Sequence, residues 1–151
     1  MRVAPVGLLC SRQDKAFDLG CEVAALTHGH PSGYLAAGFL ACVIAGIIEG
    51  QALEHAIRCA VYFLKSKAQS KECSDAVNHA LRLARSSNLS PGPRVVEQMG
   101  QGWVAEDALS ISLYCALVAQ NELREEISKL ADNMLRDPSP DSAWSEAYAP
   151  W

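Results

Sequence analysis

The sequence PSGYLAAGFLACVIAGII fills residues 31–48 and contains no charged side chain. Its length is close to what a membrane-spanning helix needs, which is about 20 apolar residues. We favour a buried central helix instead, because Pro, Ser and Gly dilute the run, no basic cluster flanks it, and the amphipathic segments that follow need an apolar partner. We therefore expect a helix over roughly Tyr34–Glu49 that ends at Gly50, and no membrane partner.

The rest of the chain alternates helix-period apolar patterns with short polar breaks, and it has almost none of the strict alternation that strands show. The clearest amphipathic pattern covers residues 53–64. The prediction is an all-α fold of about six helices. We expect a single compact multi-helix domain over residues 1–135, followed by an irregular tail over residues 136–151 that contains Pro and Trp.

Local patterns predict where some helices begin. Ser11 followed by Asp14 resembles a capping box, which favours a helix starting at Ser11. Asn121 is expected to cap the last helix, separating it from a helix that ends near residue 119. The spacing of apolar residues places Leu123 and Ile127 on the inner face of that last helix.

Composition limits the classes of function. The chain has 151 residues, of which 50% are hydrophobic, so it is long enough to bury a core without disulfides. It carries 13 Lys and Arg against 17 Asp and Glu, a formal net charge of −4, which argues against nucleic acid as a partner. The six cysteines show no paired spacing, and no secretory leader pattern opens the sequence, so we expect reduced, buried cysteines and a cytoplasmic location.

The polar loop Thr27-His28-Gly29-His30-Pro31 is the main candidate for chemistry, because it lies between two apolar segments. Two histidines one residue apart can face one ligand, but they can equally be ordinary loop residues. A metal ion needs at least one further ligand, which the spacing does not identify. Glu106 and Asp107 are expected in the first turn of a helix, where negative charge is stabilised.

Three segments together resemble a known family: MRVAPVGL at residues 1–8, LTHGHP at residues 26–31 and GQGWVAEDAL at residues 100–109. In this order they resemble the central portion of the ADP-ribosylglycohydrolase family, of the dinitrogenase-reductase-activating type. The resemblance covers about residues 1–131. It implies an all-α fold and a hydrolase that removes ADP-ribose with two Mg²⁺ or Mn²⁺ ions.

The same resemblance implies that the metal ligands are missing. Family members hold the ions with a Thr-Asp-Asp segment and a Gly-Asp-x-Asp-Ser/Thr segment, and this sequence contains neither, keeping at most Asp137. We therefore expect no catalytic residue, no metal ligand and no cofactor. The residues that the resemblance carries over to ligand binding are Met1 and Arg2, which remain from the family's Gly-rich loop, together with His28 and Tyr34.

The leading hypothesis is a truncated, non-catalytic relative that acts through binding or self-assembly. A homo-oligomer is expected, because apolar helix surface must be covered either by the tail Trp144–Trp151 or by another chain. One alternative is metal-dependent hydrolysis of ADP-ribosyl bonds, by the chain alone or completed by a partner. A second alternative is a module that binds ADP-ribose or another nucleotide without cleaving it.

Overall fold

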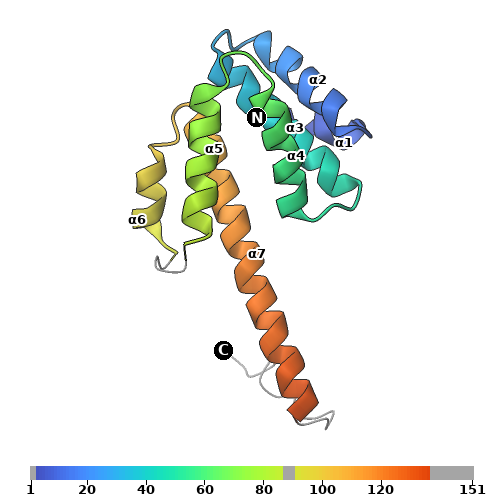
Figure 1. The fold of residues 1–151 in the computed structure, drawn as a ribbon, viewed down its shortest axis with the longest axis vertical. Coiled ribbons are helices and arrows are strands. Elements are labelled where there is room, and N and C mark those ends of the chain that lie inside the picture. Colours follow the sequence, from blue (N-terminus) through green and yellow to red (C-terminus); the bar gives the residue numbers. More distant parts are fainter. Residues whose placement is uncertain (1–2, 87–90, 137–151) are drawn as a thin grey trace. The chain divides into compact units, whose positions relative to one another are not determined.

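The computed structural model describes residues 3–86 and 91–136, and the regular structure in these ranges is entirely helical. The prediction of an all-α fold is confirmed. Figure 1 shows the helices in order: α1 (Ala4–Leu9), α2 (Gln13–Ala25), α3 (Pro31–Ile48), α4 (Leu53–Lys65), α5 (Lys71–Ala84), α6 (Pro93–Val96), the 3₁₀ turn η1 (Glu97–Met99) and α7 (Ala105–Arg136). The chain divides into two units, residues 1–117 and residues 118–151, which we describe separately.

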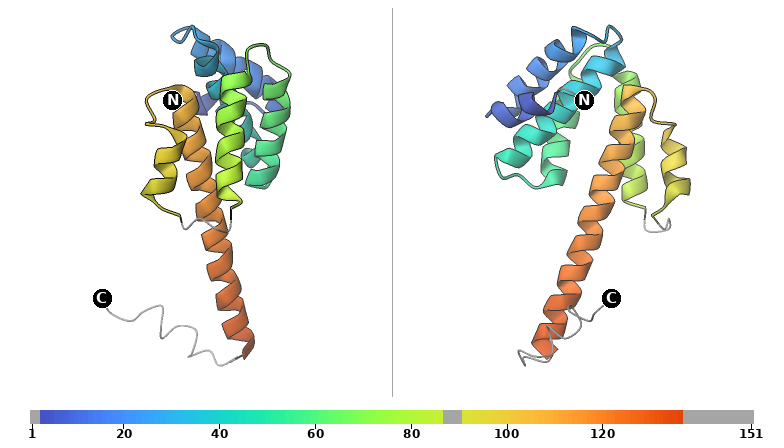
Figure 2. Two further views of the ribbon diagram at one scale, coloured as in Figure 1. Left: turned by 60° about the vertical axis from the view of Figure 1, so that its left-hand side comes forward. Right: turned by 180° about the vertical axis from the view of Figure 1, so that it is seen from behind.

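Helix α3 is the core of the first unit. It packs against α1, α2 and α4 (Figures 1 and 2). Within the described residues it is the one helix long and apolar enough to cross a membrane, and more than half of it is buried by its neighbours. Ile47 and Ile48 at its C-terminal end are exposed. The buried positions of the helix are Ser32, Leu35, Ala36, Gly38, Phe39, Ala41, Cys42, Val43, Ala45 and Gly46. The expected central helix is therefore confirmed.

The two ends of α3 follow from its terminal residues. The helix begins at Pro31 rather than near Tyr34, because proline is well suited to the first helical position, where its missing N–H would have no partner. At the other end Gly50 has a φ of 83°, as expected for a residue that terminates a helix. Its N–H donates to the carbonyl oxygen of Ile47 over 3.0 Å.

Helices α2 and α3 approach each other through glycine. A Cβ added at Gly20 would lie 3.0 Å from the Cα of Gly38 and 2.9 Å from the Cβ of Ala41. A Cβ added at Gly38 would lie 2.6 Å from the carbonyl oxygen of Phe17 and would overlap the sulfur of Cys21. Only hydrogen fits at these two positions, so glycine allows the two backbones to come close together.

The expected start of α2 is wrong. The helix begins at Gln13, and Arg12 stands at its N-cap without a side-chain capping bond, so Ser11 does not act as the cap. Arg12 instead pairs with Asp14, with 2.5 Å between Nη2 and Oδ2. The short helix α1 also was not predicted, since six residues are too few to establish a periodic pattern.

The predicted break before the last helix is also wrong. Helix α7 runs without interruption through Asn121 from Ala105 to Arg136. No glycine or proline occurs in this range, and the surrounding Leu, Arg and Glu residues favour helix strongly enough to absorb one asparagine. In the second unit Leu123 and Ile127 are 61% and 56% exposed rather than on an inner face. The expected irregular tail lies outside the described residues, except that Arg136 ends α7.

The prediction of buried cysteines holds for only part of the set. All six are free thiols, but Cys42 and Cys73 alone are buried, and Cys115 is exposed. Burial raises the pKa of the Cys42 thiol to about 12. Burial likewise raises the pKa of Cys73 to about 12, and the nearby charge of Glu106 acts in the same direction. These two thiols are therefore protonated and unreactive at neutral pH.

Candidate functional site

Helices α3, α5 and α7 all begin at the same end of the first unit (Figures 1 and 2). The start of α3 lies close to that of α5, because His30 Nδ1 is 3.8 Å from Glu72 Oε2. The start of α5 lies close to that of α7, because the charge of Glu106 acts on Cys73. We call this region the helix-start end; it comprises residues 27–32, 70–73 and 100–107.

His28 lies exposed in the loop between α2 and α3. Its Nδ1 shares a hydrogen bond of 2.8 Å with Thr27 Oγ1, which also donates to the carbonyl oxygen of Ala24 over 3.4 Å. Gly33 leaves room for the histidine, since a Cβ added there would lie 3.1 Å from the Cβ of His28. The sequence of the loop therefore fixes one edge of the His28 ring and leaves the side chain accessible.

His30 has different partners from His28. Its Nδ1 shares a hydrogen bond of 2.9 Å with the buried hydroxyl of Ser32 and faces Glu72 across 3.8 Å. In the described parts of the chain, no group of three or more His, Cys, Asp or Glu residues is arranged to hold a metal ion. The donors available at the helix-start end therefore do not fit a pair of Mg²⁺ or Mn²⁺ ions, which needs several oxygen ligands.

The loop before α7 presents an aromatic side chain to solvent. Gly100 and Gly102 have φ values of 107° and 75°, which favour glycine, and Trp103 directly after them is 89% exposed. A flat, accessible indole is suited to stacking on a base or another aromatic ring. Trp103 was not predicted from the sequence as a site residue, although a Gly-x-Gly segment directly before an aromatic residue was the available signal.

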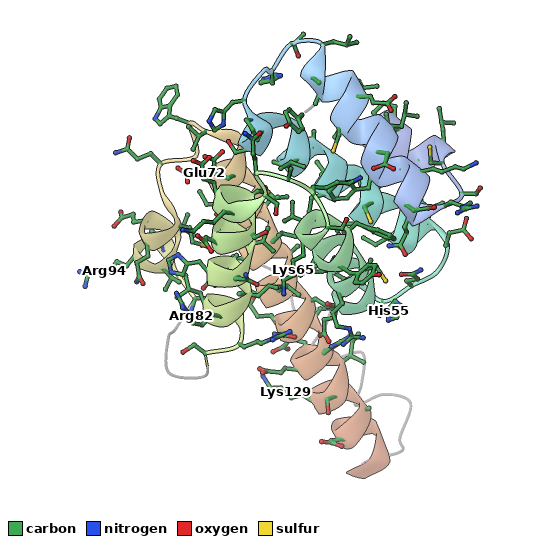
Figure 3. All side chains as sticks on the ribbon, turned by 45° about the horizontal axis from the view of Figure 1, so that its top comes forward. His55, Lys65, Glu72, Arg82, Arg94 and Lys129 are labelled. Atoms are coloured by element: carbon green, nitrogen blue, oxygen red, sulfur yellow. The ribbon has the colours of Figure 1, made fainter. Side chains whose placement is uncertain are left out.

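Carboxylates occupy the first turns of α5 and α7 at this end. Glu72 lies in the first turn of α5, and Figure 3 shows Arg82 at the opposite end of the same helix. Glu106 and Asp107 lie in the first turn of α7, as predicted, and Glu106 Oε2 is buried without a hydrogen-bond partner. These positions suit the helix dipole, but their negative charge disfavours an additional phosphate.

The predicted ligand-binding residues are only partly brought together. His28 lies at the helix-start end, and Tyr34 follows one turn into α3, half-buried, with its N–H 3.4 Å from the carbonyl oxygen of His30. Met1 and Arg2 lie outside the described residues, as does Asp137. The structure therefore places His28 at the helix-start end and Tyr34 directly after it on α3, and it adds Trp103 at the same end of the unit.

Comparison with known proteins identifies one match. A family model described as ADP-ribosylglycohydrolase matches residues 1–137. No curated protein and no solved structure matches the chain. The matched range contains every residue that the structure describes, including His28, Tyr34 and Trp103.

Proposed function

The chain belongs to the ADP-ribosylglycohydrolase family, and we propose that it binds ADP-ribose or a related nucleotide at the helix-start end without cleaving it on its own. The observation that carries this proposal is the exposure of Trp103 at the same end of the unit as the accessible His28. An indole and an imidazole offer stacking and hydrogen bonding, which are the contacts that a nucleoside accepts.

Electrostatics at this end support weak binding that depends mainly on the nucleoside. Three carboxylates, those of Glu72, Glu106 and Asp107, lie in the first turns of the neighbouring helices. They disfavour the diphosphate of ADP-ribose but not an uncharged adenosine. We therefore expect adenosine to bind at least as tightly as ADP-ribose. Binding that relied on the diphosphate would require charge-assisted contacts, which would make ADP-ribose bind much more tightly.

The donor set supports binding rather than hydrolysis. Two divalent ions would polarise the glycosidic bond and supply an activated water, and they need several oxygen ligands to stay bound. The sequence lacks both carboxylate motifs that the family resemblance implies. Among the described residues, His30 and Glu72 lie close together, but no third His, Cys, Asp or Glu joins them in a group that could hold a metal ion. His28 and Trp103 are therefore assigned to holding the ligand, and no residue is assigned to bond cleavage.

Calorimetric titration with ADP-ribose and adenosine tests this proposal. We expect Trp103→Ala to weaken binding about fivefold or more, because stacking contributes about 1–3 kcal/mol per base. His28→Ala is expected to weaken binding as well. Tyr62→Ala is the matched control, because Tyr62 is an exposed aromatic residue on α4, and it should leave the affinity unchanged. No binding by the wild-type chain, or equal affinity in Trp103→Ala and Tyr62→Ala, would contradict the proposal.

Hydrolysis is the second candidate function, and the family match is the observation that favours it. Its assay measures release of ADP-ribose from ADP-ribosylated arginine with added Mg²⁺ or Mn²⁺. We expect no metal-dependent release by the isolated chain. Release that depends on the metal and is lost in His28→Ala would replace our proposal with a hydrolase.

We also propose that the chain associates with itself. Leu8 and Leu9 end α1, Ile47 and Ile48 end α3, and all four are exposed. The two helices are packed together, since Gly7 lies against Ile44. Covering this apolar surface favours a second copy.

Light scattering tests self-association directly. We expect a homo-oligomer that Leu9→Ser weakens and that Leu123→Ser, a matched change in the second unit, leaves intact. A wild-type chain that stays monomeric over a wide concentration range would contradict the proposal.

A further inference from the structure

We infer that Asp107 is a positioning residue, which holds the loop of residues 100–104 in the conformation that presents Trp103. Its expected effect on ADP-ribose affinity rests on the proposed function. Its effect on the loop does not, because the loop conformation is a property of the chain without ligand.

The side chain of Asp107 occupies the space beside Gly100. Gly100 ends η1 with φ 107° and ψ −173°. A Cβ added at Gly100 would lie 2.6 Å from Asp107 Oδ1 and would overlap Oδ2 and Cγ of the same carboxylate. The half-buried side chain of Asp107 therefore fills the volume beside the Gly100 backbone. A group packed this closely against a backbone atom restricts how far the backbone can move toward it.

The rest of the loop has few other restraints. Gly100 N–H donates to the Glu97 carbonyl oxygen over 3.5 Å at one end, and Ala108 N–H donates to the Val104 carbonyl oxygen over 3.1 Å at the other. Between these ends, an added Cβ at Gly102 would lie 3.7 Å from Ile111 Cδ1, which is ordinary van der Waals contact. Of the two glycines in the loop, Gly100 therefore has the closer neighbour on α7, and this neighbour is Asp107.

Trp103 depends on this restraint because its own side chain is not held. At 89% exposure the indole has almost no packing contacts, so the backbone of the loop sets its direction. Glycine at two positions also makes this backbone flexible unless neighbours restrict it. Removing the Asp107 carboxylate should therefore increase the motion of Trp103. A ligand that stacks on Trp103 would then have to order the loop when it binds.

Fluorescence anisotropy of Trp103 measures this motion. The sequence has three tryptophans, so Trp144→Phe and Trp151→Phe leave Trp103 as the single fluorophore in an otherwise full-length chain. In this background Asp107→Ala should lower the anisotropy of Trp103 and weaken ADP-ribose binding about threefold to tenfold. Asp107→Asn keeps the shape of the side chain without its charge, so it should preserve the anisotropy. It should bind ADP-ribose no more weakly than the wild-type chain does, because it removes one of the carboxylates that disfavour the diphosphate.

Asp75→Ala is the matched control, because it removes an exposed carboxylate from α5 and should change neither measurement. A loss of anisotropy in Asp107→Asn equal to that in Asp107→Ala would overturn the inference, since charge rather than shape would then matter. Equal anisotropy in Asp107→Ala and Asp75→Ala would also overturn it. If no variant or wild-type chain binds ADP-ribose, the proposed function fails, while the anisotropy still decides the role of Asp107.

A double-mutant cycle gives an independent check. Gly100→Ala places a Cβ in the volume of the Asp107 carboxylate and also strains the positive φ. In the Asp107→Ala background only the backbone strain remains, so Gly100→Ala should lower the thermal unfolding midpoint less than it does in the wild-type background. Additive effects would show that the two residues do not restrain each other, and would overturn the inference.

Discussion

Replacing Gly38 by alanine should force α2 and α3 apart at their closest approach. The new methyl group would lie 2.6 Å from the Phe17 carbonyl oxygen, which is backbone, and would overlap the Cys21 sulfur. Overpacking costs about 1–3 kcal/mol, and two simultaneous collisions favour the upper end of this range. The higher helix propensity of alanine offsets about 1 kcal/mol. The expected net decrease in the free energy of unfolding is therefore about 2 kcal/mol.

Urea unfolding followed by circular dichroism measures this decrease. The midpoint should fall while the slope stays the same, since the surface exposed on unfolding does not change. Gly92→Ala is the matched control, because Gly92 has an extended φ of 171° and an added Cβ meets nothing within 4 Å. Its expected change is within about 0.5 kcal/mol. If Gly38→Ala and Gly92→Ala unfold at the same urea midpoint, α2 and α3 do not pack as the structure describes.

Three further predictions concern the first unit. Phe39→Ala, in the middle of α3 with no exposed surface, should lower the free energy of unfolding by about 3–5 kcal/mol in the same urea experiment. The pKa of both Cys42 and Cys73 is raised to about 12 in the folded chain. Because an unfolded thiol loses its proton more readily, the two thiols should stabilise the folded chain fully below about pH 8.5 and lose this contribution as the pH rises above it. From neutral pH to about pH 10, the urea midpoint should therefore fall less in Cys42→Ala/Cys73→Ala than in the wild-type chain. Lys67→Met removes an exposed ion pair with Asp18 on α2, in which Lys67 Nζ lies 2.6 Å from Asp18 Oδ1. It should change the free energy of unfolding by less than about 1 kcal/mol, with a smaller effect at high salt.

The central part of the fold could be predicted from the sequence because one segment is too apolar to lie fully exposed to water. An uncharged run of 18 residues between amphipathic segments is stable in water only when much of its surface is covered, and more than half of α3 is buried by its neighbours. The end of α3 could be predicted because glycine is required there, as Gly50 shows with its positive φ value.

Features that depend on competition between weak local preferences could not be predicted. Asn121 favours a helix start, but its preference is small compared with that of the neighbouring helix formers, so α7 continues through it. The Ser11 pattern fails for a similar reason, because Arg12 pairs with Asp14 instead. Caps and breaks of this kind contribute on the order of 1 kcal/mol, which tertiary packing easily outweighs.

The candidate site was recognised only in part, because the sequence does not show which segments meet. His28 was identified from its loop, but the meeting of this loop with the starts of α5 and α7 depends on packing between distant residues, such as His30 and Glu72. Trp103 was passed over because an exposed tryptophan and a buried one look alike in a sequence.

Equilibrium dialysis of the full chain against labelled, ADP-ribosylated arginine in the presence of Mn²⁺ tests the central claim most directly, with chromatography of the retained label. We predict that the wild-type chain retains the compound intact and that Trp103→Ala retains much less of it. Recovery of free ADP-ribose from the protein chamber, or equal retention by the two proteins, would contradict the account.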